Sequence, residues 1–515
     1  MYRQLTIAQP RSRAMMTQQL IAAAVIGWFL MAAIATPFDH DESQYVAGAY
    51  FSQTLLVFRD FLYLQPPLHS WVYAPVAWLF PAHMVVAMRL ATALSAVGAL
   101  AALWLAQRVA GIARDSAAIA TLLIAATAAF QFTGTVVRND MLPTLWVSMG
   151  MLATLLAMRH GTPRYWLAAG VLFGLAIATK LNFAPLGLGT GMFVISSGGR
   201  CGVKAALWLV VGAMIGMMPM VWIFAMAPGG FIYGVLTYGA TAPYAWYSAN
   251  GAGHALSLTG KLGDLLLSLA KGSALVGLLA IAANVFASRH RKRAPGRRLA
   301  IWMIVGALIG AALPTPSQLQ YIMPVLPPLA LGLGYLLEDA RSWVFAWQQT
   351  LLGLLCLSAV AGMAPTVLDA VDMMRNGSPI WRADQAADWA GNTVRSLSPR
   401  TRIATLSAHM ILGSGLHLDP RFATGPFAYR SGWTISPTFA RQLHAMIPAT
   451  LSDMDRDPPE AILTGYEMGK RKLPLKPDAG LIGYARSRGY RMFPMPDGVG
   501  RLYIREARPQ DIRND

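Results

Sequence analysis

Long apolar runs alternate with short polar segments along most of the first 365 residues. About 20 apolar residues in a helix are enough to cross the hydrocarbon core of a bilayer. The pattern predicts a multi-span α-helical membrane protein with about eleven transmembrane helices. The predicted spans cover residues 19–36, 86–107, 116–134, 141–158, 165–180, 183–197, 205–225, 262–287, 299–313, 321–337 and 343–363.

Two polar segments between spans are too long to be simple turns. Residues 37–85 contain an acidic start with helical periodicity, then a Pro-Pro pair and an aromatic-rich amphipathic stretch. This pattern predicts two helices lying along the membrane surface. Residues 226–261 are rich in Gly, Tyr and Trp, which predicts an irregular loop at the level of the lipid headgroups.

The composition changes sharply after residue 365, where Pro, Arg and Asp become frequent and no spanning run follows. "RADQAADWAGNTV" has the periodicity of an amphipathic helix, and "RTRIATLSAH" and "EAILTGYE" read as short strands. We therefore predict two domains, a transmembrane domain at 1–365 and a small α/β or α+β domain at 366–515.

Charge is scarce and strongly biased. Only 13% of the residues are charged, about half the usual share of a soluble protein, and the formal net charge is +18. The basic residues gather in short loops between spans, most densely in "SRHRKRAPGRR" at 288–298. This is the pattern of the positive-inside rule, so a nucleic-acid partner is not expected. The N-terminus is predicted to be cytoplasmic, and an odd number of spans places residues 366–515 on the outer face.

The sequence "FDHDESQY" puts Asp41 and Glu42 directly after the first predicted span. Successive helical residues point about 100° apart, so the two carboxylates do not both face one substrate atom. One interpretation is structural, because acidic residues stabilise a helix N-terminus by about 0.3–1 kcal/mol. The other is chemical, since carboxylates near lipid are costly unless they have a partner or a function.

Further polar residues occur at the outer ends of other predicted spans: Arg138, Asp140, Lys180, Gln318, Gln320 and Tyr321. Each has a structural alternative. Arg138 and Asp140 suit a local salt bridge, and Lys180 suits a side chain that reaches from a span to the headgroups. Their convergence on one face, beneath a soluble domain, favours a common site.

The motifs "DESQY", "QPPLHSWVYAPVAWLF", "RNDMLPTLW", "GLAIATK" and "QYIMPVLPP" stand in this order between residues 41 and 328. With their placement relative to the spans, the chain resembles the GT-C family of polyprenyl-phosphate-dependent glycosyltransferases over about residues 19 to 340. The most similar groups are the protein O-mannosyltransferases and the bacterial aminoarabinose and galacturonosyl transferases that modify lipid A.

The resemblance implies a bacterial inner-membrane enzyme that transfers a sugar from a polyprenyl-phosphate donor to a hydroxyl of a glycolipid, polysaccharide or protein at the outer face. It implies that Asp41 is the general base, that Glu42 orients it or holds a cation, and that Asp140 is a second acid. A divalent cation held by Asp41 and Glu42 remains an open question. The resemblance further implies phosphate contacts from Lys180, first in rank, and from Arg138 and Arg59. The implied pocket residues are Tyr45, Gln65, His69, Gln320 and Tyr321.

Two alternatives remain open from the sequence. A transporter or flippase would place its ionisable residues near the bilayer midplane and often shows an internal repeat. A catalytically degenerate protein that only binds lipid-linked sugar is also compatible, because Gln65 and Gln318 stand where several relatives carry a basic residue. A neutral amide does not replace the charge of a cation at a phosphate.

Overall fold

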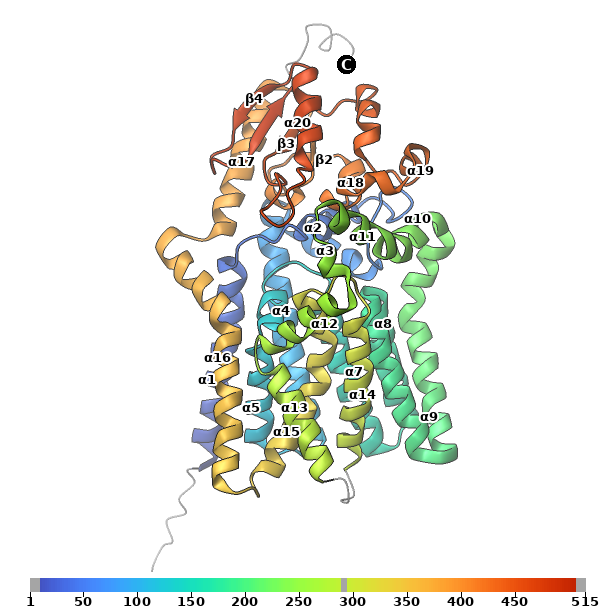
Figure 1. Cartoon of the computed structure of the whole chain (residues 1–515), viewed down its shortest axis with the longest axis vertical. Helices are drawn as coiled ribbons and strands as arrows, with labels where there is room; N and C mark the ends of the chain where they lie inside the picture. The colour runs from blue at the N-terminus through green and yellow to red at the C-terminus, as the bar shows by residue number, and fades with distance from the viewer. Residues whose placement is uncertain (1–9, 289–293, 506–515) are drawn as a thin grey trace, which may run out of the picture.

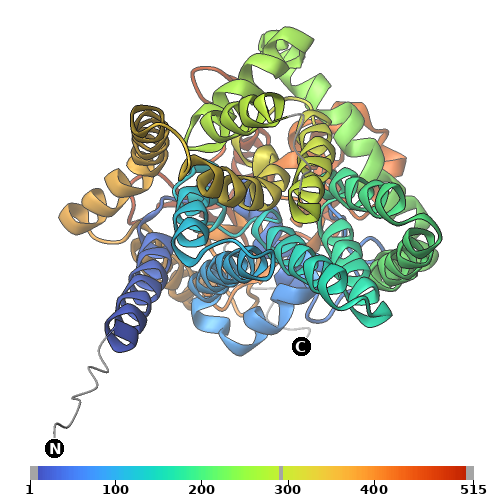
Figure 2. The same cartoon turned by 90° about the horizontal axis from the view of Figure 1, so that it is seen from below.

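The computed structural model describes residues 10–288 and 294–505, so residues 289–293 of the basic run at 288–298 lie outside the described residues. Long helices run side by side in one bundle, and a small domain that contains a β-sheet covers one end of it (Figure 1). Seen from below, α1 (Pro10–Ala35) and α9 (Ala184–Met226) lie at opposite edges of the bundle (Figure 2).

The bundle is built from apolar helices with short connections. Beside α1 and α9 they are α4 (Met84–Val109), α5 (Arg114–Ala125), α6 (Ala128–Thr133), α7 (Met141–His160), α8 (Pro163–Thr179), α12 (Leu258–Ala270), α13 (Ala274–Ala287), α14 (Pro295–Ala312), α15 (Leu326–Ala340) and α16 (Phe345–Asn376). Within the described ranges seven helical stretches are long and apolar enough to cross a membrane, or up to eight if the bent pair α12–α13 is one span. The multi-span membrane fold is confirmed, with fewer helices of full spanning length than the eleven predicted.

Two predicted spans are broken. The segment 116–134 divides into α5 and α6, and the segment 262–287 divides into α12 and α13, which meet at 92°. Gly272 lies at the second break with a φ of +127°, and a Cβ there would come within 2.7 Å of the Thr127 Cα. The two breaks pack against each other at this point, and only glycine fits such a close approach and backbone conformation.

The predicted spans 183–197 and 205–225 are the two parts of α9, which folds back on itself. A Cβ on Gly202 would lie 2.6 Å from the carbonyl oxygen of Val194, eight residues earlier. A straight helix would separate those residues by about 12 Å. The second part packs on α8 without side chains between the backbones, because Gly170 and Gly174 face Gly212 and Gly216. Small residues at this spacing allow close contact between membrane helices.

The two segments predicted to lie on the outer face contain helices. Residues 37–85 form α2 (Glu42–Phe51) and α3 (Leu68–Leu79), as predicted, but α2 is almost entirely buried between the bundle and the C-terminal domain (Figure 1). The prediction of an irregular loop at 226–261 is wrong for much of its length. This segment contains α10 (Pro228–Ile232), a π-helical turn at Tyr233–Thr237 and α11 (Tyr238–Ala249). Its aromatic residues pack under the C-terminal domain, where the Trp246 and Trp433 rings stack with centroids 6.3 Å apart.

The C-terminal domain has a five-stranded mixed sheet in the order β2-β1-β3-β5-β4. Its strands are β1 (Arg402–Thr405), β2 (His417–Leu418), β3 (Ala461–Thr464), β4 (Arg491–Pro494) and β5 (Arg501–Ile504). β1 pairs in parallel with β2 and β3, whereas β5 pairs antiparallel with β3 and β4. Its helices are α17 (Pro379–Leu397), α18 (Pro426–Arg430), α19 (Pro437–Gln442) and α20 (Asp478–Ser487). The predicted amphipathic helix and both predicted strands are confirmed as α17, β1 and β3.

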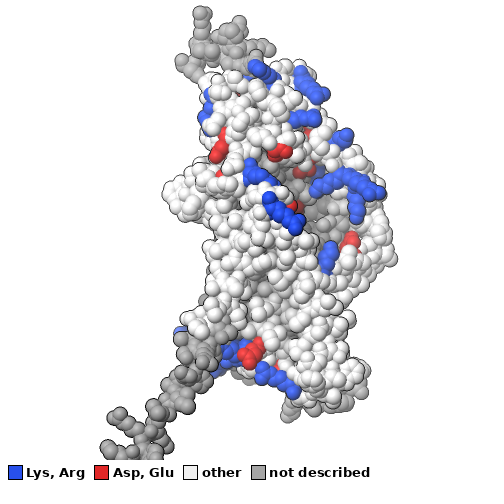
Figure 3. All heavy atoms as spheres, turned by 90° about the vertical axis from the view of Figure 1, so that its left-hand side faces the viewer, with Lys and Arg blue, Asp and Glu red and all other residues white. Residues whose placement is uncertain are grey.

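The surface carries charge at two levels. On the face shown in Figure 3, Lys and Arg gather over the half of the molecule that carries the C-terminal domain and again at the opposite end. The band between these two regions is almost free of charge. A band of this kind is what a hydrocarbon layer requires, because charged side chains are costly there. The end of the bundle covered by the C-terminal domain is called the domain end below.

Candidate active site at the domain end of the bundle

Asp41 occupies the N-cap position of α2, but its side chain makes no capping hydrogen bond. Instead one carboxylate oxygen lies 3.0 Å from Nε2 of His40, and the other lies 2.6 Å from Nη2 of Arg138. The side chain is 18% exposed, as is that of Asp39, so these two carboxylates are partly open while Arg138 beside them is buried. The structural interpretation of Asp41 as a helix cap is therefore not supported by its contacts.

Glu42 points the other way and is fully buried. Its carboxylate pairs with Arg89 of α4, with Oε1 2.8 Å from Nε, and also accepts hydrogen bonds from the backbone N–H groups of Asp39 and Val137. Arg89 is fully buried too and donates to the carbonyl oxygens of residues 33, 36 and 37. Glu42 thus joins the end of α1, the start of α2 and the segment before α7, and its role is to position them.

A chain of ion pairs links the residues predicted from separate outer turns. Arg138 pairs with Asp39 and Asp41 and lies 3.5 Å from Asp140. Asp140, fully buried at the N-cap of α7, accepts a hydrogen bond of 2.5 Å from Nζ of Lys180. Lys180 ends α8 in an extended conformation, which turns its side chain into the bundle. These charged residues therefore lie together, as their placement in the sequence predicted. Asp39 belongs to the same network but was not predicted.

The residues predicted to line a pocket lie around this network. The Lys180 ammonium lies 5.0 Å from the centroid of the Tyr321 ring, and Gln320 is buried in the same turn, Leu319–Val325. Gln65 accepts a hydrogen bond of 2.9 Å from Nδ2 of Asn139. Tyr45 and His69 are buried together, with ring centroids 5.2 Å apart. Burial lowers the pKa of His69 to about 3, so its imidazole is neutral at physiological pH.

Arg59 lies outside this network. Its guanidinium forms two hydrogen bonds of 2.8 Å with the neighbouring Asp60, and its side chain is 54% exposed. Arg59 is thus paired with its neighbour in the sequence and open to water. Among the interactions described, it has no contact with the carboxylates of the site.

The C-terminal domain closes over the site. Ser43 of α2 hydrogen-bonds Nδ1 of His409 at 2.7 Å, and the His40 ring stacks on Phe427 of α18 at 5.8 Å. Burial lowers the pKa of His40, but the charges of Asp41, Asp39 and Glu467 outweigh burial and raise it above its usual value. Burial raises the pKa of Glu467 to about 7, against the opposing charges of His40 and Arg430. Sequence analysis missed these contributions, because residues of two domains meet only in the fold.

Asp39, His40 and Asp41 also form a set of possible metal ligands, with one ligand atom from each lying within 4.8 Å of the others. Two carboxylates and an imidazole suit a divalent cation. Arg138 already pairs with both carboxylates, and Glu42 is taken up by Arg89. The donor set therefore fits a cation only if Arg138 moves away from it.

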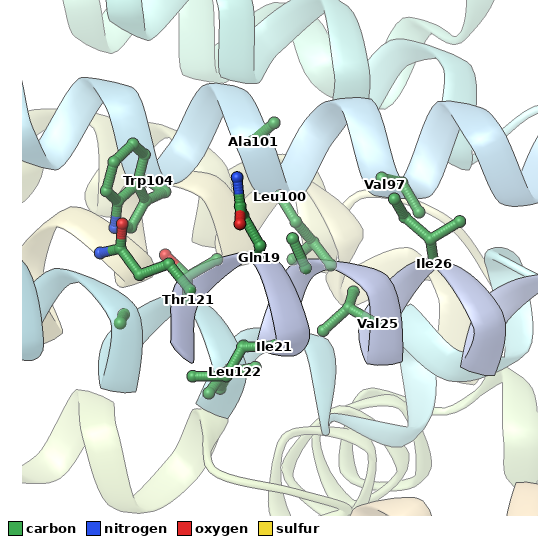
Figure 4. Close-up of a pocket in the computed structure, with 13 residues that line it drawn as sticks. Gln19, Ile21, Val25, Ile26, Val97, Leu100, Ala101, Trp104, Thr121 and Leu122 are labelled. Carbon is green, nitrogen blue, oxygen red and sulfur yellow. The ribbon is translucent and has the colours of Figure 1, made fainter. Parts of the chain in front are cut away.

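A separate cavity of about 370 Å³ lies between α1, α4 and α5 (Figure 4), and none of the charged residues of the site lines it. Val25, Val97, Leu100, Trp104 and Leu122 contribute to its walls, which are almost entirely apolar. Without ionisable side chains it has no means of acid–base catalysis. Its composition suits contact with hydrocarbon chains, and we place no reaction there.

Known proteins share the fold. ArnT from Cupriavidus metallidurans, solved bound to undecaprenyl phosphate and in the apo state, aligns over 96% of this chain and 98% of its own, with a TM-score of 0.60 and 14% and 15% identity, respectively. The Archaeoglobus fulgidus oligosaccharyltransferase aligns over 96% of this chain and 75% of its own, with a TM-score of 0.50 and 13% identity. No curated protein sequence matches the chain.

Part of the sequence also matches a family model. Residues 64–224 match the model described as dolichyl-phosphate-mannose-protein mannosyltransferase. That segment includes Gln65, Arg138, Asp140 and Lys180, whereas Asp41 and Tyr321 lie outside it. The family-model match covers 161 of the 515 residues, and the likeness to ArnT over 96% of the chain is one of fold; both agree with the resemblance of this multi-pass membrane protein to the GT-C glycosyltransferases.

Proposed function

We propose that the protein is an inverting glycosyltransferase that uses a polyprenyl-phosphate sugar donor at the outer face of a bacterial inner membrane. The observation that carries the proposal is the position of Asp41. With Asp39 it is one of the two partly exposed carboxylates, each 18% exposed, of a network in which Arg138, Asp140 and Lys180 are buried, and acid and cation lie side by side there. Glycosyl transfer from a lipid phosphate needs both a base and positive charge at this level.

The proposed reaction divides the work between the two ends of the network. The acceptor hydroxyl oxygen attacks the anomeric carbon, the bond from that carbon to the phosphate oxygen breaks, and the polyprenyl phosphate leaves. Asp41 takes the acceptor proton, a contribution of about 10²–10⁴-fold for general-base catalysis. Lys180 is the first candidate for the phosphate. Arg138 holds Asp41 in place through its 2.6 Å contact.

Undecaprenyl phosphate bound to ArnT, which shares the fold, supports the choice of donor class. The positive-inside pattern supports a cytoplasmic N-terminus and an outer C-terminal domain, and the composition change supports a division near residue 365. Acceptors compatible with this site are a lipid A-like glycolipid, a polysaccharide or a protein hydroxyl. A transporter is disfavoured, since the ionisable residues of the network lie at helix ends and not at the middle of the bundle.

The test is mass spectrometry of envelope glycolipids and glycoproteins from a deletion strain carrying wild type, Asp41→Asn or Asp453→Asn. Asp453 is the control, because it pairs with the exposed Arg441 on the C-terminal domain. We expect a sugar-sized mass that disappears on deletion and returns with wild type and Asp453→Asn but not with equally abundant Asp41→Asn. No sugar-sized difference in any fraction would refute transfer. Full restoration by Asp41→Asn would leave transfer standing and refute Asp41 as the base.

A further inference from the structure

The charge balance of the site leaves a donor phosphate short of positive charge. Asp39, Asp41 and Asp140 bring three carboxylates, and Arg138 and Lys180 bring two cations, so these five side chains sum to −1, and a protonated His40 would bring the total only to zero. Glu42 and Arg89 cancel each other. Each cation predicted for phosphate binding already has a carboxylate partner. A phosphate that enters such a site requires a further cation.

Arg430, the last residue of α18 in the C-terminal domain, is a cation of the required kind. Its guanidinium carbon lies 4.5 Å from the centroid of the Phe427 ring and 5.1 Å from that of the Trp246 ring. Its Nε is buried and has no hydrogen-bond partner, and within residues 10–288 and 294–505 no carboxylate lies at ion-pair distance from it, although the Tyr238 hydroxyl contacts its side chain and the Glu467 carboxyl feels its charge. Aromatic faces hold a guanidinium through its plane and leave its N–H edges available for an anion.

Its contacts place Arg430 over the same space as Asp41. Phe427, under the guanidinium, stacks on His40, and Nε2 of His40 lies 3.0 Å from Asp41. On the other side, Trp246 precedes Tyr247, whose hydroxyl accepts a hydrogen bond of 3.2 Å from Gln318 at the turn that carries Tyr321. Burial raises the pKa of Tyr247, and the charges of both Arg430 and Asp41 reach its hydroxyl. Arg430 thus faces the site from the C-terminal domain, as Lys180 does from the bundle.

We propose that Arg430 binds the phosphate of the polyprenyl donor, so that the C-terminal domain supplies a phosphate ligand opposite Lys180. This rests on the proposed glycosyltransferase function and adds a residue from outside the membrane domain. A guanidinium binds two phosphate oxygens at once through its parallel N–H groups. The need for positive charge at the phosphate grows during the reaction. The phosphodiester of the donor carries one negative charge, whereas the departing phosphate monoester carries about −1.5 to −2 at pH 7.

The test measures binding of three lipids to the full-length protein in nanodiscs: a polyprenyl monophosphate, the matching polyprenol, and phosphatidic acid. Wild type is compared with Arg430→Met, Arg430→Lys and Arg441→Gln. Arg441 is the matched control, since it lies on the same domain and pairs with Asp453 at the surface. For wild type we expect at least tenfold tighter binding of the polyprenyl phosphate than of the polyprenol. Arg430→Met should reduce this ratio by about 10- to 100-fold, and Arg441→Gln should not change it.

The outcomes separate this proposal from the proposed function. An unchanged phosphate-to-alcohol ratio in Arg430→Met would overturn the role of Arg430 and leave the donor class intact. An equal loss of phosphatidic acid binding would show a general lipid-phosphate contact and overturn the assignment to the donor. A wild-type protein without preference for the phosphate would refute the donor class and this proposal with it. If Arg430→Met does not fold, Arg430→Lys decides, because it keeps the charge but loses the paired N–H donors of the guanidinium. We expect Arg430→Lys to reduce the phosphate-to-alcohol binding ratio about three- to tenfold, and an unchanged ratio would overturn the proposal.

Discussion

The buried pair of Glu42 and Arg89 gives the sharpest test of how the site is held in place. Both side chains are fully buried, with Nε of Arg89 2.8 Å from Oε1 of Glu42. Removing one partner of such a pair leaves an uncompensated charge in a medium of low dielectric, which costs about 3–5 kcal/mol. Arg89→Met also leaves three backbone carbonyl oxygens without their donor. We therefore expect Arg89→Met to lower the free energy of unfolding by at least that amount.

A double-mutant cycle isolates the charge interaction. Glu42→Gln keeps an acceptor for the Val137 N–H but leaves Arg89 without its counter-charge, so it too should cost about 3–5 kcal/mol. In the double variant no buried charge remains unpaired. Its cost should therefore fall below the sum of the single costs by about 2–3 kcal/mol.

The measurement is equilibrium unfolding of the purified protein in mixed micelles, followed by tryptophan fluorescence. Glu338→Gln is the control, because Glu338 is 31% exposed and forms a 3.7 Å pair with Arg341, which is 50% exposed, and the amide oxygen of Gln still accepts from the Ala113 N–H. A surface pair of this kind contributes at most about 1 kcal/mol. Single variants of Glu42 and Arg89 that cost less than about 1 kcal/mol each, or costs that simply add in the double variant, would refute the reasoning.

Two further predictions concern protons and metal. The pKa of Glu467 is raised to about 7, so the folded state holds its proton to a higher pH than the unfolded state does. Its contribution to stability, on the order of 3 kcal/mol, is present near pH 4.5 and is lost as the pH rises to about 7. The difference between wild type and Glu467→Gln in pH-dependent unfolding measures it, and identical slopes would contradict it. The charged groups that face Glu467 are His40, Arg430, Lys470 and Asp478. Because a guanidinium already pairs with Asp39 and Asp41, we expect transfer activity after exhaustive chelation to stay within about twofold of the untreated enzyme, and loss of activity that a divalent cation restores would contradict this.

Several features were accessible from the sequence because their cause is local. The bilayer fixes the length of an apolar run, so the spans around residues 19–36, 86–107 and 141–158 were predicted correctly. Hydrophobic periodicity also identified α17, β1 and β3. The gathering of charges from separate outer turns was predicted as well, since alternating spans return the chain to the same face of the membrane.

Other features have a local signal in the sequence but depend on a partner far along the chain. Arg89 stands alone among apolar residues of α4, and a charge in a span needs a partner, so its pairing with a carboxylate was open to prediction. The identity of that partner was not, because Glu42 is 47 residues away. The break at Gly272 depends in the same way on Thr127, which approaches it only in the folded bundle.

The sequence by itself determined that the protein is a membrane bundle with a small C-terminal domain, and which charged residues share one end. Hydropathy and charge are properties of short segments, and the bilayer acts on each segment separately. Only the tertiary structure decided which carboxylate faces outward: Glu42 is buried against Arg89, and Asp41 is left at the opening. It also brought Arg430 and Glu467 over the site, because packing of two domains depends on surface shapes that no single segment encodes.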